Sequence, residues 1–404
     1  MPDWDALRTE VLETFTPGPP INEVALFAGR RGVIQRLQDT TVEKARHPII
    51  YGERGVGKTS LANIFHKDLN TPTRHVEEIY VTSDVRDSFD SLWRKVFRRI
   101  RRPKSNLTAD LEYLGPIEPD HVILELSKFG PNLIPIIIID EYDRIEDADC
   151  RILMTDVIKG LANTKTNPTI VLVGVADNIT QLIVDHASIT RNVAQIPMTR
   201  MIPEEIEQII VSRIKRLRMR ITSDAVWRIV YFSAGLPFYA HSLGKYASLQ
   251  AIKSKKEGIT ENHVIDAIDD CMADVDYSIR ESYTRATERI YRKENKFAKI
   301  LAACALAQTN DLGQFVAVAV EGPLTDILGV PYKVPAFGFA LNEMCAERGH
   351  VFVKTGERKT YRYHFRDAAM QPYVIMKSLK GGIISREILE KYQVTRQLSL
   401  SIGH

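Results

Sequence analysis

The sequence predicts an α/β protein in which a doubly wound parallel sheet is followed by a helical domain and a winged-helix domain. Strand and helix patterns alternate from about residue 30 to residue 200, and the predicted strands are continuous runs of Ile and Val. Strand patterns stop after Met201, where helical periodicity takes over. Strands buried on both faces read as continuous apolar runs, and strands that alternate with helices build parallel sheets.

The elements of the α/β region follow one another in a regular order. A short helix over 1–16 is ended by the turn-rich TPGPP, and a helical stretch follows over 31–45. Predicted strands lie at 47–52, 77–84, 134–140, 168–177 and 194–198. Predicted helices between them lie at 61–69, 87–100, 121–129, 148–163 and 179–193. We therefore expect a linker over 1–29 and an α/β domain over 30–201.

Two further domains are predicted after this region. Four helical stretches define a helical domain over 202–290; they lie at 202–217, 223–234, 236–254 and 261–275. Beyond it, helical stretches at 296–307, 322–329 and 335–347 precede two alternating strands joined by a Gly-containing turn within 350–365. Three helices followed by a β-hairpin are the order of a winged helix, which we place at 291–380, with a tail over 381–404.

Composition excludes several classes of protein. The 404 residues carry a formal net charge of +3, and the four cysteines show neither zinc-ligand nor CxxC spacing. The N-terminus lacks the apolar stretch of a signal peptide, and the apolar run at 133–139 is too short to span a bilayer. We expect a cytoplasmic protein with free thiols and no membrane segment. Residues 290–404 contain 16 Lys and Arg against 10 Asp and Glu, which suggests an acidic partner there.

A phosphate-binding loop is the strongest chemical signal. The segment GERGVGKTS fits the pattern GxxxxGK[ST], with a predicted strand before it and a helix after it. Its glycines let backbone N–H groups curl around phosphates, Lys58 supplies a positive charge, and the Thr59 hydroxyl can ligate Mg²⁺. The predicted ligand is ATP with Mg²⁺. The residues expected to contact it are Gly52, Glu53, Arg54, Gly55, Val56, Gly57, Lys58, Thr59 and Ser60.

A pair of carboxylates completes this prediction. In IIIIDEYD, Asp140 ends a buried strand and is expected to hold Mg²⁺, while Glu141 polarises the attacking water. The alternative is that the pair caps a helix, and Asp143 is a candidate cap for the next one. We therefore expect hydrolysis of ATP to ADP and phosphate.

Together these motifs resemble AAA+ ATPases. FAGR at 27–30, the phosphate loop, the DE pair, VGVAD at 173–177 and a later GLP occur in the order of origin-recognition initiators and of the related STAND-type ATPases. The resemblance covers about residues 21–250 and extends loosely to about 375. It implies a helical lid over 202–290 and a homo-oligomer that assembles or switches with ATP.

The resemblance also implies roles for residues outside the two motifs. Val24, Leu26 and Phe27 would pack on adenine or serve as ordinary linker packing. Asp177, in preference to Asn178, would be the sensor that contacts the γ-phosphate or the water.

Two more residues complete the set that the resemblance implies. Arg191 would be an arginine finger for a neighbouring subunit, or else a surface residue at a helix end. Initiators carry a sensor arginine where this chain has GLPFYAHSLG, so Pro237, as in STAND ATPases, and His241 are the candidates there. That departure favours a switch that retains nucleotide.

Two basic clusters in the sequence are candidate contact sites for partners. The first surrounds Trp93 and Phe97 and would line a pore, a partner or DNA phosphates; it consists of Arg94, Lys95, Arg98, Arg99, Arg101, Arg102 and Lys104. The second marks the predicted hairpin; it consists of Lys354, Arg358, Lys359 and Arg362. A hairpin of this kind contacts double-stranded DNA or another protein.

Two functional hypotheses follow from the sequence. The first is an ATP-dependent oligomeric switch on or near DNA, acting in initiation, transposition or prokaryotic defence. The second is a nucleotide-binding signalling scaffold that recruits a separate effector protein, with little hydrolysis and no DNA.

Overall fold

The computed structural model describes residues 3–20, 29–72, 75–102, 107–130, 133–164, 166–176, 179–183, 189–288, 296–310, 312–357 and 360–392. The chain divides into two compact units. The first, here called the α/β unit, comprises Pro20–Thr199. The second, here called the C-terminal unit, comprises Arg200–His404 together with Met1–Pro19.

A five-stranded parallel sheet forms the centre of the α/β unit. Its strands are β1 (His47–Gly52), β2 (His75–Thr82), β3 (Leu133–Asp140), β4 (Thr169–Val175) and β5 (Val193–Pro197). Their order across the sheet is β2-β3-β4-β1-β5, and every neighbouring pair is parallel. Consecutive strands that are not neighbours require crossovers, so the predicted doubly wound sheet is confirmed.

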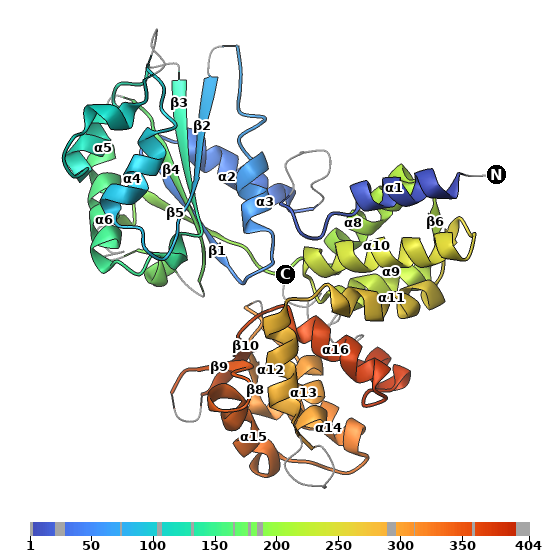
Figure 1. Cartoon of the computed structure of the whole chain (residues 1–404). Helices are drawn as coiled ribbons and strands as arrows, with labels where there is room; N and C mark the ends of the chain where they lie inside the picture. The colour runs from blue at the N-terminus through green and yellow to red at the C-terminus, as the bar shows by residue number, and fades with distance from the viewer. Residues whose placement is uncertain are drawn as a thin grey trace. The chain divides into compact units, whose positions relative to one another are not determined.

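Helices cover both faces of this sheet. Figure 1 shows α4, α5 and α6 on one face and α2 and α3 on the other. Their bounds are α2 Arg31–Val42, α3 Lys58–Ile64, α4 Phe89–Phe97, α5 Pro119–Leu126 and α6 Ala148–Leu161. The core between them includes Trp93 and the run of isoleucines from Ile136 to Ile139, all with no exposed surface. Burial on both faces explains why β3 is an unbroken apolar run.

One predicted helix of this unit lies partly outside the described residues. Of the helix expected over 179–193, Ile179–Gln181 form a short 3₁₀ helix, Ile189 is helical and 190–192 form a turn that leads into β5. Residues 184–188 lie outside the described part of the chain.

The C-terminal unit begins with a group of five helices. They are α8 (Pro203–Arg216), α9 (Ser223–Ser233), α10 (Pro237–Lys253), α11 (Glu261–Ala273) and α12 (Tyr277–Thr287). A two-residue parallel pair between β6 (Arg220–Ile221) and β7 (Gly258–Ile259) also lies here, although no strand was predicted within 202–290. Two residues are too few to give an alternating pattern. The helical region that was predicted to follow the sheet is confirmed.

The N-terminal helix α1 (Trp4–Thr14) packs on α10 within this unit. The buried His241 accepts a hydrogen bond at Nδ1 from the backbone N–H of Thr16, at 3.3 Å, and its ring meets Phe15 edge-on at 6.2 Å. Gly244 has no room for a side chain, because a Cβ at this position would lie 2.4 Å from the Phe15 ring. His241, a candidate for nucleotide contact, therefore joins α1 to α10.

A second group of elements follows, from Lys296 onward. It contains α13 (Lys296–Leu306), β8 (Phe315–Val316), α14 (Glu321–Leu328), α15 (Val334–Ala346), β9 (Phe352–Thr355), β10 (Arg362–Phe365) and α16 (Met370–Lys380). The strands form an antiparallel sheet in the order β8-β10-β9, and β9 and β10 are the predicted hairpin. Strand β8 was not part of the predicted order of three helices and a hairpin. With only two residues, it is too short to give a strand pattern in the sequence.

The predicted tail is partly folded. Residues 386–392 are helical, and Leu389 is fully buried. The Tyr392 hydroxyl and the Lys391 ammonium both donate to Asp326 on α14, at 2.5 and 2.6 Å. Across the described residues, no helix has the length and apolar character needed to cross a membrane.

His241 makes the stability of the C-terminal unit depend on pH. Burial, with the nearby Arg213 cation, lowers the pKa of His241 from its usual 6.5 to about 3. Since the folded-state pKa is depressed, the unfolded chain takes up the proton first, so stability falls as pH drops below 6.5 and continues to fall until about 3. At pH 5 the loss should be about 2 kcal/mol.

Urea unfolding at pH 7.5 and 5.0 would measure this effect. The variant His241→Asn keeps an acceptor for the Thr16 N–H without the titration, so it should lose that part of the pH dependence. The same replacement at the exposed His350 is the control and should leave the dependence unchanged. An equal pH dependence in His241→Asn and the parent chain would contradict the assignment.

Candidate active site

The phosphate-loop segment lies where β1 ends and α3 begins. Gly55 and Gly57 have φ of 84° and 93°, which is left-handed backbone that favours glycine. Gly52, with φ of 149°, has a different requirement, because a Cβ there would lie 2.2 Å from the backbone oxygen of Met198. The glycines of the motif thus serve loop conformation at two positions and close packing at the third.

Lys58 is buried and closes this loop. Its Nζ donates hydrogen bonds to the backbone oxygens of Gly52 and Glu53, at 3.0 and 2.8 Å. Burial lowers the pKa of Lys58 to about 8, although Asp143, Asp140 and Glu53 oppose this shift. The ammonium is therefore mostly charged at neutral pH. Phosphate oxygens are stronger partners for it than the two carbonyls.

Asp140 ends β3 and is almost fully buried. Its Oδ2 accepts a hydrogen bond from the Tyr80 hydroxyl at 2.5 Å, and its Oδ1 accepts one from the backbone N–H of Glu141 at 2.8 Å. Burial and the bond to Asp140 raise the pKa of Tyr80 far above its usual value, so Tyr80 stays a donor. Sequence reasoning missed Tyr80, whose only signal is a polar group two residues before the end of the neighbouring strand.

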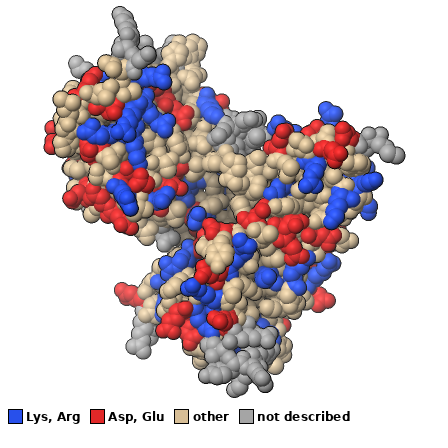
Figure 2. Space-filling view, in the orientation of Figure 1, with Lys and Arg blue, Asp and Glu red and all other residues tan. Residues whose placement is uncertain are grey.

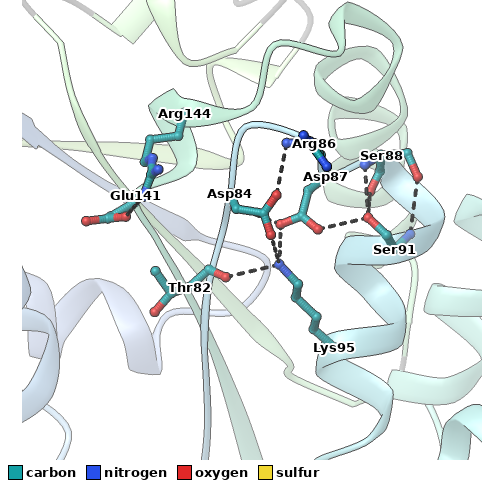
Figure 3. A network of polar contacts seen from close by, with 9 residues as sticks. All are labelled: Thr82, Asp84, Arg86, Asp87, Ser88, Ser91, Lys95, Glu141 and Arg144. Carbon is teal, nitrogen blue, oxygen red and sulfur yellow. Dashed lines mark hydrogen bonds and ion pairs between the residues drawn. The ribbon is translucent and has the colours of Figure 1, made fainter.

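Glu141 follows in a left-handed conformation, with φ of 54°. Its Oε2 lies 2.7 Å from Nη1 of Arg144, and both side chains are about half exposed. Figure 3 shows this pair beside the loop that follows β2. Glu141, the predicted base, is therefore engaged in an ion pair with Arg144 that was not predicted from the sequence. The i,i+3 spacing of the two residues is the signal that could have revealed it.

Asp143 has a different role from the predicted one. Its Oδ1 accepts the backbone N–H of Val175 at 2.8 Å, which holds the end of β4 against the turn after β3. The cap of α6 is Asp147, which accepts from the N–H of Asp149 at 3.0 Å. The prediction that Asp143 caps the next helix is wrong, because a better-placed aspartate precedes that helix.

The basic residues around α4 are largely paired with acidic ones. Lys95 lies between Asp84 and Asp87, at 2.8 and 2.5 Å, and Figure 3 shows both carboxylates turned toward its ammonium. On the face drawn in Figure 2, blue and red side chains of this unit lie next to one another. Three arginines complete the pattern: Arg94 pairs with Asp90, Arg98 with Asp110, and Arg102 with Glu112 and Glu125.

Pairing of this kind weakens the positive potential that a nucleic acid would meet. Glu125 has no exposed surface and also accepts from Lys128 and Tyr113, at 2.7 and 3.0 Å, so the pairs hold α5 to the segment that follows α4. Arg99 and Arg101 are exposed, and Lys104 lies outside the described residues. The cluster as a whole is therefore mainly a structural network.

The structure places the remaining predicted residues as follows. Arg191 is exposed in the turn before β5, and Thr59 is half-buried in the first turn of α3. Pro237 is the first residue of α10 and so belongs to the C-terminal unit. Asp177, Asn178 and the candidate adenine contacts Val24, Leu26 and Phe27 lie outside the described residues.

The donors gathered at this edge suit a hard cation. The Asp140 carboxylate and the Thr59 hydroxyl supply oxygen ligands of the kind that Mg²⁺ takes together with phosphate oxygens and water. The phosphate loop follows the end of β1, and Asp140 ends β3, so the loop and the carboxylate pair lie at the same edge of this parallel sheet. That edge is formed by the carboxyl ends of β1 and β3, the usual position for ligands in an open α/β sheet.

Comparison with known proteins agrees with this geometry. Residues 40–183 match the family model described as AAA domain. No curated protein sequence matches the chain significantly.

The chain is similar to several solved structures, and the first two below share its fold. The ORC2 protein of Aeropyrum pernix is 14% identical with a TM-score of 0.53, covering 96% of this chain and 98% of that one. The Walker-type ATPase paby2304 of Pyrococcus abyssi is 13% identical with a TM-score of 0.50, covering 89% and 99%. The Aeropyrum pernix ORC1 protein in complex with DNA is 15% identical with a TM-score of 0.49, covering 92% and 96%.

The position of Lys58 leads to a direct test of nucleotide binding. Replacing Lys58 with Ala removes the buried ammonium that faces the phosphate loop, so ATP affinity measured by calorimetry should fall by about 100-fold or more, the range for loss of a charge-assisted contact of about 3 kcal/mol. Lys44→Ala, at an exposed lysine before β1, is the matched control and should bind ATP like the parent chain. Unchanged affinity in Lys58→Ala would remove the basis for the site.

Proposed function

The chain carries an AAA domain of the AAA+ P-loop ATPases at residues 40–183, and on this basis we propose that it binds and hydrolyses ATP as an oligomeric switch. The observation that supports this most is the placement of the Lys58 loop and the Asp140–Glu141 pair at one edge of the parallel sheet. The function rests on this arrangement of a phosphate-binding cation, an oxygen ligand and a base.

Each residue has a defined task in the proposed reaction. The Lys58 ammonium binds and orients the phosphates when it leaves the carbonyls of Gly52 and Glu53. Tyr80 donates to one oxygen of Asp140, which restricts the orientation of the carboxylate. Mg²⁺, held by Thr59 and Asp140, would supply charge neutralisation at the phosphates. Glu141 would take the proton of the attacking water once its carboxylate separates from Arg144.

The proposed action on or near DNA rests on the C-terminal elements. We propose that α13 to β10 form a winged-helix module, with β9 and β10 as its wing. Helix α15 contains neither Lys nor Arg, so phosphate contacts would fall to the hairpin. There Lys354 donates to Asn342 at 3.0 Å and lies 3.7 Å from the centre of the Tyr361 ring, and Arg362 is exposed. Initiation, transposition or prokaryotic defence would each use such a module.

One observation favours the second candidate, a scaffold that holds nucleotide and recruits an effector. Arg144 occupies the carboxylate of Glu141, which leaves the base engaged in an ion pair at 2.7 Å. An exposed pair of this kind contributes about 0–1 kcal/mol, so it would slow the release of the base without abolishing hydrolysis. Pro237, which stands at the start of α10 in place of a sensor arginine, also favours the scaffold.

A comparison of variants at Glu141 separates the two candidates. Glu141→Gln keeps the shape and removes the base, so the switch should lose about 100-fold or more in turnover while ATP binding is retained. Arg144→Ala should leave turnover equal or higher, because it frees the carboxylate. Glu146→Gln, at an exposed glutamate in the same loop, is the control. Phosphate release measures all three rates, and equal slow rates in the parent chain and Glu141→Gln would support the scaffold.

The oligomer is tested at Arg191. If this exposed arginine completes a neighbour's site, turnover per subunit should rise with protein concentration, and Arg191→Ala should lose about 1,000-fold while each chain still binds ATP. Mixing Arg191→Ala with Lys58→Ala should restore part of the activity, since some junctions then pair an intact loop with an intact arginine. Arg36→Ala, at an exposed arginine on α2, is the control. Turnover that is independent of concentration, with no recovery on mixing, would mean that each chain acts alone.

A further inference from the structure

Four consecutive residues connect the two units of the chain. The boundary between the units falls between Thr199 and Arg200, inside a segment that runs from Met198 to Met201 and is called the connector below. The described residues on both sides of this boundary are held by specific contacts. Each half of the connector is therefore held by contacts within its own unit.

The first half of the connector is fixed to the phosphate loop. The N–H of Met198 donates to the backbone oxygen of Tyr51 at 2.7 Å, and the oxygen of Met198 lies so close to Gly52 that no Cβ fits there. Arg30, which is buried, donates to Sδ of Met198 at 2.9 Å and to the backbone oxygen of Thr199 at 2.6 Å. A displacement of the Gly52 backbone must therefore move Met198.

The second half is fixed to the turn that precedes Pro237. The N–H of Met201 donates to the backbone oxygen of Gly235 at 2.9 Å, and a Cβ on Gly235 would lie 2.7 Å from the oxygen of Met201. The guanidinium of Arg200 donates to the backbone oxygen of Ala234 and to Oε1 of Gln371. The connector thus contacts α16, which is 171 residues further along the chain.

Gln371 carries the contact onward into the second group of elements. Its side chain has no exposed surface, and its Nε2 donates to the backbone oxygen of Ala305 on α13 at 2.8 Å. The Tyr239 side chain of α10 is fully buried. Its hydroxyl donates a hydrogen bond, at 2.6 Å, to the backbone oxygen of Ala369, which is the residue before α16. Breaking these bonds would leave buried polar groups without partners, which is destabilising, so the contacts resist independent movement of the two groups of elements.

We propose that the connector transmits occupancy of the phosphate loop to the elements from α13 to α16, with the Arg200–Gln371 contact as the coupling point. This inference rests on the proposed function, because the signal begins with nucleotide. Phosphates that bind Lys58 compete with its bond to the oxygen of Gly52, and Gly52 is the residue packed against Met198. Movement there passes from Met198 through Thr199 to Arg200, and from Arg200 to the first turn of α16.

Hydrogen exchange with and without ATP tests this coupling in the full chain. In the parent protein, ATP should change the exchange rate of backbone amides at 371–376 by more than about threefold, which corresponds to about 0.6 kcal/mol of opening free energy. Gln371→Met keeps the length of the side chain and removes both hydrogen bonds; Arg200→Ala removes the other partner. Both variants should bind ATP within about twofold of the parent and lose the change at 371–376.

A control and a folding check accompany these variants. Lys380→Ala breaks the ion pair with Asp269 at the opposite end of α16 and should keep the response to ATP. Circular dichroism and thermal unfolding establish that each variant is folded. If Gln371→Met does not fold, Arg200→Ala alone decides, since Arg200 is only half-buried and Gln371 then retains its bond to Ala305.

The outcomes separate this inference from the proposed function. A parent chain that binds no ATP in calorimetry would overturn the proposed function and, with it, the source of the signal. Binding of ATP without any change at 371–376 would overturn the coupling while nucleotide binding stands. A full response in Gln371→Met or in Arg200→Ala would also overturn it, because the contact would then carry no signal.

Discussion

The pairing of β1 between β4 and β5 is the constraint on which the rest of this molecule depends. It places Gly52 opposite Val175 and Tyr51 opposite Pro197, so three segments that are far apart in sequence end at one edge. The phosphate loop starts from that edge, and the turn after β3 reaches it through the bond from Val175 to Asp143. Parallel strands make this arrangement possible, since all their carboxyl ends lie on the same side.

Gly52 links the chemistry of the site to the architecture around it. It ends β1, begins the phosphate loop, accepts a hydrogen bond from Lys58 and packs against Met198 without space for a side chain. A residue that serves all these contacts leaves little freedom for the loop to change without its neighbours. This is the physical reason for connecting nucleotide binding with the connector, and through Gly235 with the segment that precedes Pro237.

The charges of the molecule are used mainly within its own structure. Around α4, lysines and arginines are matched by carboxylates, and the fully buried Glu125 accepts from Arg102 and Lys128. A buried carboxylate is tolerated only when it is paired in this way, so the network contributes to the order of α4 and α5. The number of Lys and Arg residues around α4 therefore overestimates the positive potential that a nucleic acid would meet there. The hairpin, in contrast, has an exposed arginine, Arg362.

By itself, the sequence was sufficient to predict the parallel sheet, the hairpin, the placement of the phosphate loop between a strand and a helix, and the helices of the C-terminal unit other than α12, α16 and the turn of helix over 386–392. These features depend on local periodicity and on short motifs, in which neighbouring residues determine the result. Tertiary structure decided the rest. The bonds from Tyr80 to Asp140 and from Gln371 to Arg200 join residues 60 and 171 positions apart, and no local pattern marks either pair. The same holds for His241, since only the packing of α1 on α10 brings the N–H of Thr16 to its ring.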